Sequence, residues 1–388
     1  MRTFALRSSG VAALFFFAFG IAHAEQRTEN YPFNSGQRLE VDLKSGGSVS
    51  VQGWDQSSVE LTVSDRRRDL GDYRFEVTPT DQGLRIAAQL KDRDGGSNLR
   101  LELKVPRSLS LDLNSAGGNL ELSDLIGRFT GRTGGGAMTL RQLSGEVELR
   151  TGGGRIEVTD STLDGKVGTG GGKVLISNVV GNLQGRSGGG NVVYKNVRSA
   201  SGDLRSQRGL AGPQADSDTV LIKSQGGRID VDSAPAGARV ETAGGKVRVI
   251  NAERFIAART GGGSMELSIG EGWVEAETGA GDIDLTVLRD IAGKGDIDLS
   301  TGHGDVTVTL PADFSMDVDI DLGVTKSAGS DPSIRSDFPL QVDESKDWDY
   351  SMGSPRRHIR ASGKPGGGLH RLKIRATNGN ITLRRAQS

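Results

Sequence analysis

The chain has 388 residues, 25% of them charged, and its 48 Lys and Arg residues balance 49 Asp and Glu residues to a formal net charge of −1. It contains no Cys and 58 Gly. Without cysteine the chain cannot form disulfides, a thiol active site or an iron–sulfur centre. Its balanced charge gives no electrostatic reason to expect nucleic-acid binding.

The first 24 residues have the layout of a secretory signal peptide. Arg2 and Arg7 precede a short apolar run, and Ala22-His23-Ala24 offers a small-residue cleavage site. The apolar run is too short to span a bilayer. We therefore expect an exported mature chain of residues 25–388, located in the periplasm or, alternatively, secreted or at the cell surface.

An 18-residue repeat dominates the centre of the chain. Each of its nine units starts with Ser or Thr and has Gly at the fourth position; the units begin at Ser115, Thr133, Thr151, Thr169, Ser187, Ser224, Thr242, Thr260 and Thr278. The sixth and eighth positions are apolar in every unit, as in Ile156 and Val158, and mostly polar residues lie between them. This alternation predicts short strands with one buried face.

Stacking lets such units bury apolar faces that one unit cannot bury alone. We therefore predict an all-β, single-domain parallel β-solenoid, or β-helix, with a right-handed coil of about 18 residues. Glycine at the fourth position is expected to allow positive φ at a corner and close approach of neighbouring coils. The Ser/Thr column is expected to form hydroxyl ladders or turn hydrogen bonds.

Breaks in the repeat divide residues 25–388 into three expected segments of one domain. We expect an N-terminal cap and first coils at 25–114, and regular coils at 115–310 with a loop at 199–219. C-terminal coils follow at 311–388, with an irregular insertion at 326–370. The repeat motif returns near the C-terminus, in Asn378-Gly379-Asn380-Ile381-Thr382-Leu383. This return predicts that the C-terminus closes the same domain.

Several segments resemble the DUF4097 family of bacterial β-strand-repeat proteins, whose domain is also named a "putative adhesin" domain. They are SGGSVSVQGWDQSSVELTV at 45–63, LKVPRSLSLDL at 103–113, the TGGGxIxV coils and RATNGNITL at 375–383. The resemblance implies an exported or envelope-associated β-solenoid, and some family members sit beside envelope-stress regulators. It brings no catalytic residues with it.

Acidic positions near the C-terminal end raise the question of calcium binding. Outward-facing carboxylates are expected at Asp282, Asp284, Asp296, Asp298 and Asp305, and the pattern repeats at Asp317, Asp319 and Asp321. Stacked carboxylates can recruit Ca²⁺, but the spacing does not match the calcium-binding nonapeptide repeat. A solvated acidic face is the alternative, and the sequence assigns no metal site.

Other chemistry-bearing residues have structural explanations. Gly170-Gly171-Gly172-Lys173 resembles the end of a phosphate-binding loop, but Val174 follows where Ser or Thr is needed. We expect the histidines to lie in solvated loops; they are His303, His358 and His370. We expect the same of two basic clusters, Arg66–Arg68 and Arg356–Arg357. For these clusters, contact with anionic envelope polymers is the alternative.

Four aromatic residues are candidates for ligand contact: Trp54, Trp273, Trp348 and Tyr350. We expect Trp54 to pack in the N-terminal cap. Trp348 and Tyr350 are expected either to clasp the insertion onto the rod or to anchor a partner or glycan.

We expect a non-enzymatic scaffold that contacts an envelope polymer or a surface protein. The sequence predicts no catalytic, cofactor-binding or metal-binding residue, no nucleic-acid partner and no membrane span in the mature chain. It leaves the oligomeric state open. One alternative is a polysaccharide lyase or hydrolase, which would need a cleft with paired carboxylates, or with Asp and Arg, at catalytic separation. Another is a periplasmic partner in envelope-stress signalling.

Overall fold

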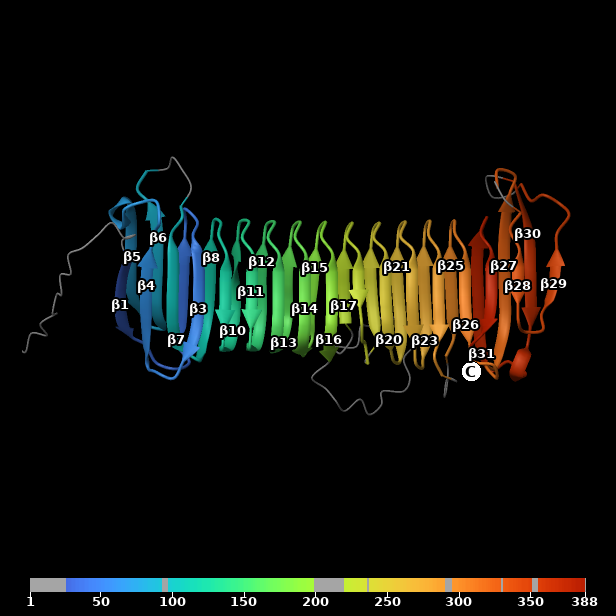
Figure 1. The fold of residues 1–388 in the computed structure, drawn as a ribbon, viewed down its shortest axis with the longest axis horizontal. Coiled ribbons are helices and arrows are strands. Elements are labelled where there is room, and N and C mark those ends of the chain that lie inside the picture. The colour runs from blue at the N-terminus through green and yellow to red at the C-terminus, as the bar shows by residue number, and fades with distance from the viewer. Residues whose placement is uncertain are drawn as a thin grey trace, which may run out of the picture.

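The computed structural model describes residues 26–92, 97–198, 220–235, 237–289, 295–328, 331–350 and 355–387. Over these residues the chain forms 32 strands, two short 3-10 helices at Leu70–Asp72 and Pro365–Gly367, and no α-helix. The strands lie across the long axis of an elongated molecule (Figure 1). The expected signal peptide at 1–24 and loop at 199–219 lie outside the described residues.

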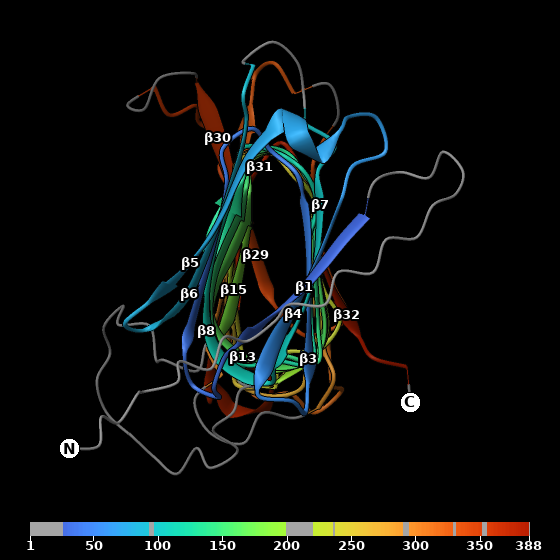
Figure 2. The ribbon, with the colours of Figure 1, turned by 90° about the vertical axis from the view of Figure 1, so that its left-hand side faces the viewer.

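The strands form two facing layers, which Figure 2 shows end-on. From the N-terminal end, layer 1 contains β5 (Tyr73–Thr80), β6 (Gly83–Leu90), β2 (Arg38–Leu43), β8 (Ser108–Ser115), β10 (Ile126–Thr133), β12 (Ser144–Thr151), the second half of β13 (Ile156–Thr169), β15 (Leu183–Ser187), β17 (Val220–Ser224), β19 (Ala238–Thr242), β21 (Phe255–Thr260), β23 (Trp273–Thr278), β25 (Ile297–Thr301), β31 (His370–Thr377), β27 (Met316–Thr325), β30 (Arg356–Gly363) and β29 (Gln341–Glu344).

Layer 2 contains β1 (Gln26–Pro32), β4 (Ser58–Ser64), β7 (Arg100–Pro106), β3 (Ser48–Trp54), β9 (Leu120–Ser123), β11 (Met138–Arg141), the first half of β13, β14 (Val174–Val180), β16 (Val192–Arg198), β18 (Ile229–Val231), β20 (Val247–Ala252), β22 (Met265–Ile269), β24 (Ile283–Val287), β26 (Val306–Leu310), β32 (Ile381–Arg385) and β28 (Ile334–Ser336). Because β13 turns a corner and pairs in both layers, all 32 strands form one hydrogen-bonded sheet.

Strands of successive repeats pair in parallel, each residue beside its equivalent in the next repeat. Thr133 pairs with Thr151 and Thr151 with Thr169, which are 18-residue steps. Alternate side chains point between the layers, and Ile156 and Val158 are fully buried there. Burial of this apolar column from both layers is the main force that holds the stack together. The predictions of an all-β fold and of an 18-residue register are therefore confirmed.

The corner after each layer 1 strand is locked by the Ser/Thr column. The Thr169 hydroxyl donates to the carbonyl of Gly154 in the preceding repeat at 2.8 Å and accepts from the N–H of Gly172 at 3.0 Å. Ser187 repeats both contacts one coil further along. These side chains are almost fully buried. The turn hydrogen bonds, one of the two expected arrangements, are thus confirmed, and we call this column of hydroxyl-to-backbone contacts the hydroxyl ladder.

The reason for glycine at the fourth position is close stacking. A Cβ on Gly172 would lie 2.1 Å from the carbonyl oxygen of Gly154, and one on Gly154 would lie 2.0 Å from that of Gly136. Neither glycine has a φ in the left-handed region, so the expected positive φ is wrong for these interior coils. Positive φ occurs instead at the tenth position, where Asp160 and Asn178 have φ of 51° and 53°.

The two ends of the molecule break the parallel pattern. At the N-terminal end β1 pairs antiparallel with β4, β4 with β7 and β5 with β6. At the C-terminal end β30 pairs antiparallel with β27 and β29. The sheet is therefore mixed, and the prediction of an entirely parallel one is wrong.

The order of coils in space differs from their order in the chain. β31 lies between β25 and β27, and β32 lies between β26 and β28. The other end has the same arrangement, because β2 lies between β6 and β8 and β3 between β7 and β9. The last strands of the chain therefore lie inside the stack and not at its tip.

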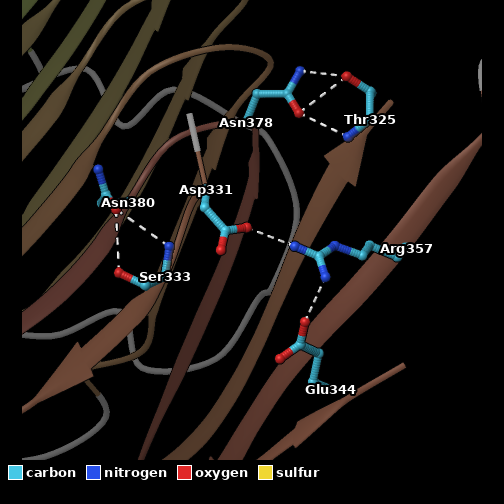
Figure 3. A network of polar contacts seen from close by, with 7 residues as sticks. All are labelled: Thr325, Asp331, Ser333, Glu344, Arg357, Asn378 and Asn380. Atoms are coloured by element: carbon cyan, nitrogen blue, oxygen red, sulfur yellow. Dashed lines mark hydrogen bonds and ion pairs between the residues drawn. The ribbon is translucent and has the colours of Figure 1, made fainter. Parts of the chain in front are cut away.

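The insertion expected at 326–370 is not wholly irregular, since it contains β28, β29 and β30. Figure 3 shows how its residues attach to the last coil. Asn378 makes three hydrogen bonds to Thr325, and Asn380 accepts from Ser333. Arg357 forms ion pairs with Asp331 at 2.6 Å and Glu344 at 2.7 Å, which ties β30 to the flanking segments; these seven residues are drawn in the figure.

Candidate functional site

A row of outward-facing residues in layer 1 carries a cluster of positive charge. The residue before each buried Ser or Thr points outward, and the parallel register aligns these residues along the rod. The row reads Arg132, Arg150, Gly168, Arg186, Lys223 and Glu241. Neighbouring strands are about 4.8 Å apart, so Arg150 and Arg186 flank Gly168 across a gap of about 10 Å.

Gly168 leaves a hollow in the surface of this layer. A Cβ at this position would have no neighbour closer than 3.9 Å, so neither close stacking nor a positive φ requires glycine here. The space is a shallow depression of about 720 Å³. Arg150, Lys166, Arg186 and Lys223 are among the residues that line it. We call this depression the cationic hollow.

The positive charge of the cationic hollow is only partly compensated. Lys223 pairs with Glu241 at 2.5 Å, and Arg150 with Glu148 at 3.4 Å. The hydrogen bond from Lys223 holds the pKa of Glu241 below its usual range, so that carboxylate stays ionised. Lys166 and Arg186 form no ion pair with any residue that the structure describes. Arg186 donates to the side-chain oxygen of Gln184 at 3.5 Å, so two cations without a carboxylate partner among the described residues flank the open space.

The floor of the cationic hollow is rigid. Thr151, Thr169 and Ser187 at its edge belong to the hydroxyl ladder. Beneath it Tyr194 is fully buried, accepting from the N–H of Gly185 at 2.5 Å and donating to the carbonyl of Leu183 at 3.0 Å. Burial raises the pKa of Tyr194, so its hydroxyl stays neutral. The basic side chains therefore project from a fixed backbone.

The chemistry of this arrangement is recognition of anions. Guanidinium groups bind carboxylates or phosphates through paired hydrogen bonds, and a concave surface concentrates their field. Glu241 is the only carboxylate among the lining residues. Acid–base cleavage of a glycosidic bond would require a pair of carboxyl groups facing one another. The hollow therefore suits holding a ligand.

The acidic positions that raised the question of calcium binding do not lie together on one face. Asp284 is on β24 in layer 2, whereas Asp298 is on β25 in layer 1. The carboxylates of Asp282 and Asp305 accept backbone N–H groups of the next coil, at Asp305 and Asn380 respectively. Within the described ranges no group of three or more His, Asp or Glu side chains is placed to hold a metal ion.

The remaining acidic positions each have a local partner. Asp296 accepts the N–H of Arg371, and Asp298 pairs with Lys373 at 3.2 Å. On β27, Asp317 pairs with Lys364 at 3.2 Å, while Asp321 contacts His358 at 2.7 Å. The last of the predicted acidic positions, Asp319, lies beside Lys373 in the strand register.

Two of the three histidines differ from expectation. His303 is exposed in a turn, as predicted. His370 is almost fully buried, stacks on Phe314 and accepts the N–H of Gly295 at 3.1 Å. It is buried because it begins β31, the strand inserted into the stack. His358 is half-buried in β30 against Asp321. The prediction of solvated loop histidines is therefore wrong for His358 and His370.

The basic clusters also have defined roles. Arg67 and Arg68 donate their backbone N–H groups to the buried carboxylate of Asp65. Arg356 and Arg357 begin β30, and Arg357 is ion-paired as described above. The expectation of solvated loop charges is wrong for this second cluster. A strand was not expected there because its apolar alternation is short.

Three of the four aromatic candidates make local contacts within the chain, and the fourth lines a hollow. The Trp54 indole N–H donates to the carbonyl of Ser58 at 2.9 Å, closing the turn between β3 and β4. Trp348 and Tyr350 hold the Lys326 ammonium 5.1 and 5.2 Å from their ring centroids, which favours the clasp interpretation. Trp273 lines a separate hollow.

The phosphate-loop alternative has no support in the structure. Gly170 and Gly172 stack on Gly152 and Gly154 at the corner that leads into β14. A phosphate-binding loop leads into a helix, and this one leads into a strand.

Sequence reasoning did not single out the cationic hollow. The signal was present, because Arg132, Arg150, Arg186 and Lys223 all precede the Ser or Thr of their units. Reading this column required the side-chain direction and the register together. The absence of a side chain at Gly168 was hidden among many other glycines.

Comparisons with known proteins give weak similarities. No family model matches the chain, and no curated protein matches it, so the resemblance to the DUF4097 family is not confirmed. A "putative adhesin" from Parabacteroides merdae is 10% identical, with a TM-score of 0.28, over 73% of this chain and 95% of that one. A "Putative lipid binding protein" from Parabacteroides distasonis is 9% identical, with a TM-score of 0.26, over 92% and 96%. Scores this low support no inference about fold or function.

Proposed function

We propose that this chain is an exported, non-enzymatic β-solenoid of the cell envelope that binds acidic polysaccharide at the cationic hollow. The observation that carries the proposal is the pair of unpaired cations, Lys166 and Arg186, beside the gap at Gly168. A polymer with a negative charge on each sugar would meet several cations along this part of the rod, and the weak contacts would add.

The architecture proposed is one domain over residues 25–388. Its coils are parallel and of about 18 residues, and segments 25–114 and 311–388 close the two ends. The register of β10, β12 and β13 supports this view, as does the insertion of β31 and β32 into the stack. The segment 1–24 supports export. N-terminal sequencing of protein purified from the periplasm tests export, with Glu25 as the expected first residue.

The binding experiment compares polygalacturonate, an acidic polysaccharide, with neutral dextran. Purified chain 25–388 is titrated with each polymer at low salt and at about 0.15 M salt, where the Debye length is about 8 Å. We expect saturable binding of polygalacturonate only, weakened by salt. Release of new reducing ends would overturn the non-enzymatic part of the proposal.

A pair of matched variants locates the site. The triple variant Arg150→Gln, Lys166→Gln, Arg186→Gln removes three charges from the hollow. At about 0.5 kcal/mol for each exposed contact, affinity should fall roughly tenfold. The control variant Arg155→Gln, Lys173→Gln, Lys195→Gln removes the same charge from exposed positions outside the hollow: Lys195 lies on β16, and Arg155 and Lys173 lie directly before β13 and β14. Equal loss in both variants would show that net charge, and not the hollow, determines binding.

A further inference from the structure

We propose that a second hollow, between β23 and β25 on the same face, binds a single pyranose ring stacked on Trp273. This hollow has a volume of about 420 Å³. Its side chains come from three neighbouring strands and one residue beside them: Trp273 and Glu275 from β23, Asp298 from β25 with Asp296 directly before it, and Arg371 and Lys373 from β31. This inference does not depend on the proposed function.

Trp273 turns one face of its ring toward the open space. Its other face stacks on Phe255 of the preceding coil, with ring centroids 4.9 Å apart and planes only 12° apart. This separation nearly equals the distance between adjacent strands, so the two ring planes lie across the rod axis. The ring face of Trp273 that is opposite Phe255 must then be directed along the rod axis toward β25.

Asp296, the residue beside Trp273 directly before the neighbouring strand β25, does not cover the Trp273 ring. Asp296 is aligned with Trp273, since Val274 pairs with Ile297. The Asp296 carboxylate is held on the far side of its strand, where it accepts the N–H of Arg371 at 3.1 Å. Among the residues that the structure describes, Asp296 therefore leaves open the position about 4.8 Å beyond Trp273, where a third stacked ring would lie.

The side chains of Glu275 on β23 and Asp298 on β25 also turn away from each other. Glu275 pairs with Arg259 at 2.6 Å on one side, whereas Asp298 pairs with Lys373 at 3.2 Å on the other. The side chains in both rows thus lean away from the gap between β23 and β25. The gap follows from these contacts and not from a missing residue.

The lining selects a polyhydroxylated ring. The electron-rich face of an indole attracts the weakly positive C–H groups of a sugar face. Carboxylates at Glu275 and Asp298 accept hydroxyl hydrogens, while Arg371 and Lys373 donate to hydroxyl oxygens. A purely apolar ring would leave these groups without partners, at a cost in affinity. A lone cation is disfavoured because Glu275 and Asp298 are already ion-paired.

The test uses three neutral sugars as probes: maltohexaose, cellohexaose and hexa-N-acetylchitohexaose. Chain 25–388 is titrated with each sugar by calorimetry and by tryptophan fluorescence. We expect saturable binding of at least one sugar. Trp273→Ala and Asp296→Tyr should each weaken it at least tenfold, the first by removing the platform and the second by filling the gap. Trp348→Ala should change it less than twofold.

Two controls keep the outcomes distinct. Circular dichroism and thermal melting establish that each variant is folded. Because Asp296→Tyr keeps Trp273, it tests the site even if Trp273→Ala unfolds. The triple variant of the cationic hollow should bind the neutral sugar as the unmodified chain does. No saturable binding of any sugar, or full binding by Asp296→Tyr, would overturn the inference and leave polygalacturonate binding as a separate question.

Discussion

Substitution of Gly172 by alanine tests whether close stacking of coils determines the glycine pattern. The new Cβ would lie 2.1 Å from the carbonyl oxygen of Gly154, 2.5 Å from its carbon and 2.9 Å from the nitrogen of Arg155. All three atoms belong to the backbone, so the coils must separate by about 1 Å at this corner. Overpacking of this kind costs about 1–3 kcal/mol.

The same separation weakens the hydroxyl ladder. Gly172 accepts from Ser187 at 2.8 Å and donates to Thr169 at 3.0 Å. Losing one of these bonds adds about 1 kcal/mol, which gives a total of about 3 kcal/mol. Opening of the coils around residues 151–190 should therefore become easier by that amount. Amide hydrogen exchange measures it locally, which matters because repeat arrays do not always unfold in one step.

The neighbouring glycine provides the control. A Cβ on Gly171 would have no atom within 4 Å, and its φ is not left-handed. Gly171→Ala should be neutral, or stabilising by about 0.5 kcal/mol, because it restricts the unfolded chain. Equal exchange rates in the Gly171→Ala and Gly172→Ala variants would refute the stacking argument.

Three further predictions concern the core, the N-terminal end and the C-terminal end. Tyr194→Phe leaves the N–H of Gly185 without its acceptor and should cost about 1–3 kcal/mol in urea denaturation; an unchanged midpoint would contradict it. For Asp65, burial opposes ionisation, but hydrogen bonds from Tyr73 and backbone N–H groups outweigh it and lower its pKa. The native state then binds this proton less readily than the unfolded state, so the stability contributed is complete above about pH 4 and is lost as pH falls through the lower native value. The stabilities of Asp65→Asn and of the unmodified chain should differ at pH 7, and the difference should shrink as the pH falls below about 4. Asn378→Ala removes three hydrogen bonds to β27 and should speed amide exchange in β27 and β31 while leaving β12 unchanged.

The sequence predicted the strands and their register because one physical signal controls both. A two-residue alternation within an 18-residue repeat allows few other arrangements, so the pairing of Ile156 with Val174 followed directly. The order of coils at the C-terminal end did not follow. The motif at Asn378 showed that the chain rejoins the stack, but a repeat does not state which neighbours a coil takes once an insertion intervenes.

The functional surfaces were still less accessible from the sequence. A hollow depends on the direction in which side chains lean, and the contacts of Asp296 and Asp298 with β31 were not visible in a chain read in order. The same limit applied to His370, whose burial results from strand insertion and not from its polar neighbours.

The insertion of β31 and β32 gives this molecule a fixed sequence of assembly. During synthesis β27 and β28 leave the ribosome before the strands that separate them from β25 and β26. The C-terminal end therefore waits for the final residues of the polypeptide, whereas the central coils have neighbours that are adjacent in the chain. If those coils paired early with β27, the last strands would be excluded from their place.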